Sequence, residues 1–468
     1  MRKLGSVDMV MLMIDSPRTP NHMGPLLICD PQRPSGGPLT FTELVDGVAA
    51  KLDGAPMLRR RLISSPLGLD NPYWVDDPNF DIEFHIRQTA LPKPGDWKQL
   101  CTHISRLTSR QIDLTRPPWE LYVIEGLDGI SGVPQDAFGV FIKIHHTAID
   151  GREGVELLNV LTTVEPDTYV KQASNSGWSP LPLPSPWNMW WRTAASLPDR
   201  PVAAIKLLSK AIPSIARVGM GLLRSGDQGA SVTAPYTRFS GVAGPHRVFD
   251  AAEFDFSDIK RLRARVPGST VNDVALTIVG GALRRYLTKH GELPDDSLSA
   301  MVPISTRSAK DVGEGGNQIS NTKVGLATDI ADDLERLRVI AEATKDIKNV
   351  RRGVGASQLA ALSEVVPGQL LGAGLRATAE LAARAKVVPA ANVAVTNVPG
   401  PRVPLYFLGS KVLSMYGVGP IQEGMGIIHL VGSYCDTLSI SVVGDRDTLG
   451  DIEFYLQCLR ESFDALSS

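Results

Sequence analysis

Two adjacent histidines, His145 and His146, are the residues of this chain whose type and setting best suit catalysis. A neutral imidazole, with an ordinary pKa of about 6.5, can accept a proton from a hydroxyl group at neutral pH. The chain has no Gly-x-Ser-x-Gly segment, the usual setting of a serine nucleophile. The pattern therefore favours direct transfer assisted by a general base over a covalent enzyme intermediate.

The segment that carries the histidines predicts how they are held. Residues 138–145 form a nearly unbroken apolar run, which is typical of a strand covered on both faces. Asp150, with Glu153 three residues later, has the chemistry of a helix N-cap. The histidines are thus expected at a strand end, before a tight turn into a helix. Neighbours on a strand point to opposite faces, so both can face one cavity only if the turn has already begun.

Two other interpretations apply to these histidines. A core histidine with satisfied hydrogen bonds is the ordinary interpretation for His145. A metal site is disfavoured, because adjacent strand histidines diverge and no second pair of histidines or cysteines supports them.

The His-His-x-x-x-Asp-Gly string of residues 145–151 resembles the signature of the CoA-dependent acyltransferase superfamily, which includes chloramphenicol acetyltransferase and peptide-synthetase condensation domains. Further matches, and the opening stretch 7–24, narrow the resemblance to the bacterial wax ester synthase/diacylglycerol acyltransferase family over essentially the whole chain. Pro118 stands where that family more often carries Leu. The matching segments are Pro117-Pro118-Trp119-Glu120, Asn272-Asp273 and Asn397-Val-Pro-Gly-Pro401.

The resemblance implies an α/β (α+β) fold of two chloramphenicol-acetyltransferase-like domains, each a mixed sheet with helices, with an active-site tunnel between them. It makes His146 the catalytic base midway along that tunnel. It also implies that Asp150 shapes the turn and is held by an arginine, for which Arg59 is the candidate, and that Gly151 is a substrate-binding residue. The alternative for Arg59 is a solvated surface position. No metal, nucleotide or redox cofactor is implied, and acyl-CoA is the co-substrate.

The implied reaction moves a long-chain acyl group from acyl-CoA to the hydroxyl of diacylglycerol or of a long-chain alcohol. Two alternatives stay open. One is a condensation-type or polyketide-associated acyltransferase that uses a carrier-protein thioester, and the other is a non-catalytic protein that binds lipid surfaces. The net charge of −2 gives no indication of nucleic-acid binding.

Four further residues are candidates for the site, each with a structural alternative where the sequence offers one. Asn272, in the first turn of an expected helix, can donate to a developing oxyanion. Asp273 is three residues after Thr270 and either caps that helix or binds substrate. Trp119 is either a core anchor or a substrate contact. The resemblance places Asn397 among the substrate-binding residues.

The length of 468 residues predicts two domains. We expect an N-terminal domain over 1–171, a linker and basic crossover segment over 172–243, and a C-terminal domain over 244–468. Alternating apolar residues predict a strand over 80–90. The prolines at 399–401 end another strand and could carry the chain across between the domains.

Residues 187–224 are basic and carry three tryptophans, with one acidic residue among them. Such a segment either lies in the headgroup region of a membrane or packs on protein as a helical crossover. No run of 18 apolar residues occurs, and the four cysteines are scattered, which is typical of a reducing compartment. The first residues are acidic too early for a signal peptide. We therefore expect a cytoplasmic protein at the inner membrane face or at lipid droplets.

Overall fold

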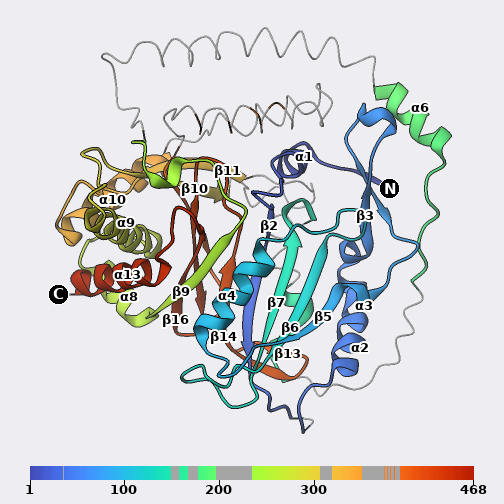
Figure 1. Cartoon of the computed structure of the whole chain (residues 1–468), viewed down its shortest axis with the longest axis horizontal. Helices are drawn as coiled ribbons and strands as arrows, with labels where there is room; N and C mark the ends of the chain where they lie inside the picture. The colour runs from blue at the N-terminus through green and yellow to red at the C-terminus, as the bar shows by residue number, and fades with distance from the viewer. Residues whose placement is uncertain are drawn as a thin grey trace.

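The computed structural model describes residues 1–34, 36–148, 158–166, 178–196, 234–305, 319–349 and 391–467, together with residues 374, 377, 380 and 384. Within these ranges the chain forms two large sheets that lie side by side, each with helices against it (Figure 1). Both sheets mix parallel and antiparallel neighbours. The predicted α/β class with two mixed sheets is confirmed.

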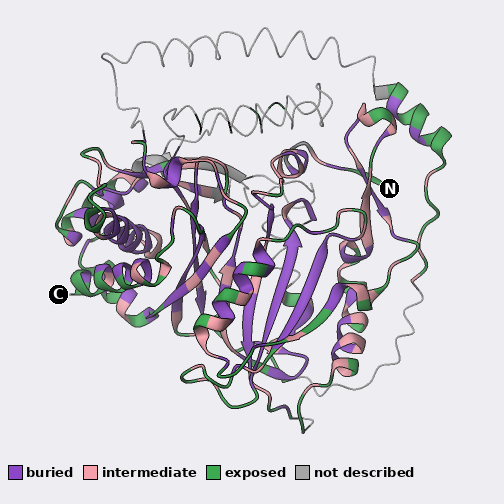
Figure 2. Ribbon diagram, viewed as in Figure 1, coloured by how far each residue is buried: buried purple, intermediate pink, exposed green. Residues whose placement is uncertain are grey.

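The first sheet has seven strands, and its centre is the most deeply buried part of the N-terminal half (Figure 2). Every residue of the strand Phe138–His145 is buried, which confirms the strand predicted over 138–145. In spatial order the strands are β5 (Ile86–Ala90), β6 (Trp119–Glu125), β7 (Phe138–His145), β2 (His22–Cys29), β14 (Ser410–Val418), β13 (Tyr406–Phe407) and β8 (Thr162–Thr163).

Strand β14 comes from the C-terminal half of the chain. It pairs antiparallel with β2, from Val412 opposite Cys29 to Val418 opposite Gly24. The chain therefore does cross between the halves after Pro399-Gly400-Pro401, as predicted. The N-terminal sheet is completed by a hairpin from outside residues 1–171.

The second sheet has six strands and a single helical layer of its own (Figure 1). Its apolar core is built around one long, largely buried helix, α9. In spatial order the strands are β11 (Ile319–Gly325), β10 (Ser299–Ser305), β12 (Val393–Val398), β15 (Ile427–Tyr434), β16 (Thr437–Asp445) and β9 (Arg247–Asp255), and the helices are α8 (Phe256–Ala264), α9 (Val271–Lys289), α10 (Asp333–Asn349) and α13 (Ile452–Ser467).

Smaller elements complete the N-terminal half. A three-stranded sheet lies beside the main one, and short helices flank both. These elements are β1 (Arg2–Lys3), β3 (Arg60–Ile63), β4 (Tyr73–Asp76), α1 (Ser6–Met13), α2 (Phe41–Lys51), α3 (Ile82–His85), α4 (Trp97–Thr108) and α6 (Pro186–Ser196), with the short 3-10 helices η1 (Leu52–Gly54), η2 (Pro56–Arg59), η3 (Pro66–Gly68), η4 (His146–Ala148) and η5 (Arg238–Ser240).

A further apolar cluster contains residues of both halves and joins them. It forms where helix α4 packs between the N-terminal sheet and β9. Phe141 of β7 and Phe249 of β9 belong to this shared core. At its edge the indole nitrogen of Trp97 donates to Asp250 Oδ1 at 2.7 Å. The halves are thus joined by apolar packing and by a hydrogen bond to a half-buried carboxylate.

The strand predicted over 80–90 is wrong in its first half. Residues 82–85 form the helical turn α3, and the strand begins at Ile86. Asp81 caps the turn by accepting from Glu83 N at 3.0 Å. The ring of His85 stacks on Phe80 and on Trp119, at centroid distances of 5.4 and 4.6 Å. The alternating apolar residues at 82 and 84 thus lie on a helical turn and not on a pleated strand.

The contact between Trp97 and Asp250 gives a prediction about stability. Trp97→Phe keeps the aromatic packing but leaves a half-buried carboxylate without this donor, so the free energy of unfolding should fall by about 1–3 kcal/mol. Denaturant unfolding would measure it. The matched control is Lys98→Ala, which removes an ion pair with Glu453 between exposed side chains and should change stability little. Equal effects of the two variants would contradict the prediction.

Candidate active site

His145 is the last residue of β7 and is fully buried. Its Nδ1 accepts a hydrogen bond from the backbone N–H of Thr147 at 3.2 Å, with the Thr147 hydroxyl 2.8 Å away. The proton of the neutral ring therefore lies on Nε2, which is 3.9 Å from Asp15 Oδ1. Burial, and to a lesser degree the neighbouring His146, lower the pKa of His145 to about 3. A buried ring with a fixed tautomer is suited to holding the turn.

His146 lies in a different setting, because the strand has already ended. It opens the 3-10 turn η4, and its backbone N–H donates to Asn21 O at 3.0 Å. The residue is half-buried; its Nδ1 is enclosed and has no hydrogen-bond partner in the part of the chain that the structure describes. Burial lowers the pKa of His146, so the ring is neutral at physiological pH. The turn frees the two rings from strand alternation.

A loop near the N-terminus fixes this turn, and sequence reasoning gave it no role. Asp15 Oδ1 accepts from Asn21 N at 2.8 Å, and Asp15 Oδ2 accepts from Gln111 Nε2 at 2.9 Å. The Asn21 side chain donates to Met11 O at 2.7 Å, while its carbonyl holds the backbone of His146. The only signal was the match of residues 7–24 to the family's opening stretch.

Asp150 and Gly151 lie outside the described residues, so the expected pair between Arg59 and Asp150 stays a prediction. Arg59 itself is buried and forms an ion pair with Asp53 Oδ1 at 2.5 Å, while its guanidinium lies 4.9 Å from the ring centre of Trp178. The interpretation of Arg59 as a solvated surface residue is therefore wrong.

Trp119 has the contacts of a core anchor. Its side chain is buried, its indole N–H donates to Leu58 O at 2.7 Å, and its ring stacks on His85. Its one polar atom is thus already used within the protein.

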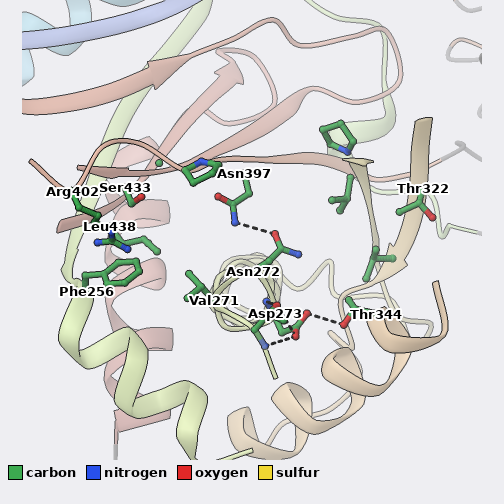
Figure 3. Close-up of a pocket in the computed structure, with 16 residues that line it drawn as sticks. Phe256, Val271, Asn272, Asp273, Thr322, Thr344, Asn397, Arg402, Ser433 and Leu438 are labelled. Atoms are coloured by element: carbon green, nitrogen blue, oxygen red, sulfur yellow. Dashed lines mark hydrogen bonds between the residues drawn. The ribbon is translucent and has the colours of Figure 1, made fainter. Parts of the chain in front are cut away.

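The other candidates meet in a cavity of about 480 Å³ in the C-terminal half. Asn272, Asp273 and Asn397 all line it, and none of its lining residues is His146 (Figure 3). The cavity is bounded by the first turn of α9 and by residues of β10, β11, β12, β15 and β16, with Phe256 of α8 and Thr344 of α10. The structure thus groups the sequence candidates into two sets, one around the histidines and one around the start of α9.

Asp273 is occupied by helix capping. Its Oδ2 accepts from the N–H and the hydroxyl of Thr270 at 2.7 and 2.8 Å, and its Oδ1 accepts from Thr344 Oγ1 at 2.8 Å. The side chain is buried. Both carboxylate oxygens are therefore used to hold α9 and α10, which supports the capping interpretation over substrate binding.

Comparison with known proteins agrees with this architecture. Residues 4–275 match the model of the wax ester synthase/diacylglycerol acyltransferase catalytic domain, and residues 315–467 match that of the WS/DGAT C-terminal domain. The chain belongs to the wax ester synthase/diacylglycerol acyltransferase family. It is therefore an acyltransferase.

Two named relatives match nearly the whole length of this chain. A Mycobacterium tuberculosis protein provisionally named as a diacylglycerol O-acyltransferase is 30% identical over 97% of this chain and 87% of its own length. A second one from that organism is 31% identical over 100% and 97%.

One solved structure is of the same family, and another shares only the fold. The wax ester synthase/diacylglycerol acyltransferase of Marinobacter aquaeolei is 25% identical, with a TM-score of 0.69 over 100% of this chain and 98% of that one. A trichothecene 15-O-acetyltransferase of Fusarium sporotrichioides shares the fold at 14% identity, with a TM-score of 0.58 over 99% of this chain and 94% of that one.

Two further structural findings concern metal ions and membrane spanning in this acyltransferase. In the described ranges, no group of three His, Cys, Asp or Glu side chains could hold a metal ion. Within the same ranges, no helix is both long and apolar enough to cross a bilayer.

The lowered pKa of His146 gives a prediction about pH. If His146 is the general base, it must be unprotonated to act, and its lowered pKa should keep the enzyme active further into acid than a solvated histidine would. The acid limb of kcat/KM, measured with acyl-CoA and an alcohol acceptor, should have its midpoint below about 6.5. A midpoint clearly above that value would contradict a buried neutral base.

Proposed function

We propose that this enzyme moves a long-chain acyl group from acyl-CoA to the hydroxyl of diacylglycerol, and also to long-chain alcohols, with His146 as general base. The observation that carries the proposal is the setting of His146, a neutral and half-buried imidazole at the end of a fully buried strand. The names of the relatives support diacylglycerol and long-chain alcohols as acceptors.

The reaction would proceed in one addition and one elimination. Since Nδ1 of His146 is enclosed, Nε2 is the nitrogen that would accept the hydroxyl proton. The alcohol oxygen then forms a bond to the thioester carbonyl carbon, and the carbonyl oxygen becomes an oxyanion to which Asn272 donates. When the tetrahedral intermediate collapses, the carbon–sulfur bond breaks and the imidazolium returns its proton to the CoA thiolate.

The two alternatives are distinguished by assay. A carrier-protein thioester as donor is suggested only by fold similarity, such as that to the first condensation domain of the calcium-dependent antibiotic synthetase, with a TM-score of 0.55 at 14% identity. A non-catalytic lipid-surface protein would release no CoA. CoA release from palmitoyl-CoA is measured with dipalmitoylglycerol or hexadecanol as acceptor, and acyl transfer to the same acceptors is measured with an acyl-carrier-protein donor. The three possibilities predict different results in these two assays.

Replacing the base is the central test. His146→Ala should lower kcat by about 100-fold to 10,000-fold with little change in thermal unfolding, because general-base catalysis contributes that much. The matched control is His145→Ala, which removes the ring that holds Thr147 and should lower the unfolding temperature together with activity. A folded His146→Ala enzyme with near wild-type turnover would refute the mechanism.

We further propose that helix α6 binds a lipid surface, at the inner face of the membrane or on a droplet. Trp187, Trp190 and Trp191 are 67%, 45% and 61% exposed, whereas Met189 and Thr193 on the same helix are buried. The helix has no acidic residue and lies at the edge of the molecule (Figures 1 and 2). Indole rings with one apolar and one polar edge suit the bilayer interface. The rest of the predicted segment, 197–224, lies outside the described residues.

Lipid binding by α6 is tested by replacing its exposed rings. The double variant Trp187→Ser/Trp191→Ser should bind liposomes of phosphatidylglycerol and phosphatidylcholine at least about 10-fold more weakly, since each ring loses apolar contact with the bilayer. The double Phe variant keeps aromatic area and is the control. Sedimentation with liposomes measures both, and unchanged binding of the Ser variant would favour packing of this segment on protein.

A further inference from the structure

The cavity beside α9 contains a pair of side-chain amides. Asn397 Nδ2 donates to Asn272 Oδ1 at 3.4 Å (Figure 3). Because this contact occupies the oxygen of Asn272, the NH2 group of Asn272 is left for a ligand. Within the described residues, that NH2 group donates no hydrogen bond that the structure shows.

Most other polar groups around the cavity already have partners. Asp273, Thr270 and Thr344 bond to one another, as described above. Ser433 Oγ accepts from Gly400 N at 3.2 Å. Arg402 donates to Cys435 O at 2.8 Å, and its guanidinium lies 3.3 Å from the ring centre of Phe256. The NH2 group of Asn272 is therefore a donor available to a polar atom of a ligand among the apolar side chains of the cavity.

The backbones that carry the two amides are fixed. Asn272 lies in the first turn of α9, directly after Val271 and next to the capping Asp273. Asn397 lies opposite Val431 where β12 runs parallel to β15. What stays free is the 180° rotation of each amide, which exchanges a donor for an acceptor at the same place.

We propose that Asn397 is a positioning residue that holds the amide of Asn272 with its NH2 group toward the cavity, where it meets the carbonyl oxygen of the donor thioester. The inference rests on the proposed function. It assigns to the cavity a ligand that carries a hydrogen-bond acceptor. The two N–H bonds of the Asn272 side chain, at the N-terminus of α9, would stabilise a negative charge that develops on this oxygen. The opposite rotamer would present the Asn272 carbonyl to that charge and oppose it.

The first test is a double-mutant cycle in the full-length enzyme with palmitoyl-CoA and hexadecanol. Asn397→Leu, close in size but without a donor, should lower kcat by about 10-fold to 100-fold and change KM little. If Asn397 acts through Asn272, Asn272→Ala/Asn397→Leu should be no slower than Asn272→Ala alone. Multiplicative losses would overturn the inference. An unchanged kcat in Asn272→Ala would instead refute the oxyanion role of Asn272 in the proposed mechanism.

The second test uses a variant of nearly identical shape. In Asn397→Asp the protonated carboxyl group can donate to Asn272 Oδ1 as the amide does, whereas the ionised group accepts from Asn272 and turns its NH2 group away. The kcat of Asn397→Asp relative to wild type should therefore recover as the pH falls toward the carboxyl pKa, ordinarily about 4. The same pH dependence in the Asn272→Ala background would show a direct charge effect on the substrate, and would overturn the inference. A ratio that stays constant with pH would also overturn it.

Discussion

The end of strand β7 is the constraint on which the site depends. The strand is buried along its whole length between β6 and β2, so its last residue, His145, has no freedom to turn toward solvent. Its ring is used inside the protein, where its Nδ1 accepts from the backbone N–H of Thr147. That bond closes the turn at the point where His146 leaves the strand. A deeply buried histidine thus sets the position of the one proposed to react.

Burial also decides the charge state of this region. It lowers the pKa values of His145 and His146, and that of His22, the strand partner of His145. Among the described residues, a protonated His145 would lose its hydration without a carboxylate close enough to pair well, since its contact with Asp15 is 3.9 Å. The fold therefore favours neutral rings, which a proton-accepting role requires.

The hairpin of β13 and β14 connects the two groups of candidate residues. Asn397 lies one residue before the end of β12, shortly before the chain leaves the C-terminal sheet, and β14 then pairs with β2, which in turn pairs with β7. The amide pair and the histidine turn are therefore linked first by the covalent chain between β12 and β13, and then by the paired strands β14, β2 and β7. Helix α4 and its contact with β9 add apolar packing between the halves. Mutual placement of the two groups is a property of both sheets together.

The sequence by itself determined the elements whose patterns are local. The apolar run of β7 predicted its strand, because a strand buried on both faces is built mainly of apolar residues. Thr270 and Asp273 predicted the start of α9, because a capping box needs only neighbouring residues. The resemblance of the motifs gave the family. Local alternation failed at residues 80–85, where His85 is held by Phe80 and by Trp119, which is distant in sequence.

Only the tertiary structure decided that Arg59 is buried beside Asp53, that Asn21 holds the backbone of His146, and that Asn397 meets Asn272, 125 positions away in the chain. These contacts join residues far apart in sequence or depend on burial, and no pattern of neighbouring residues encodes them.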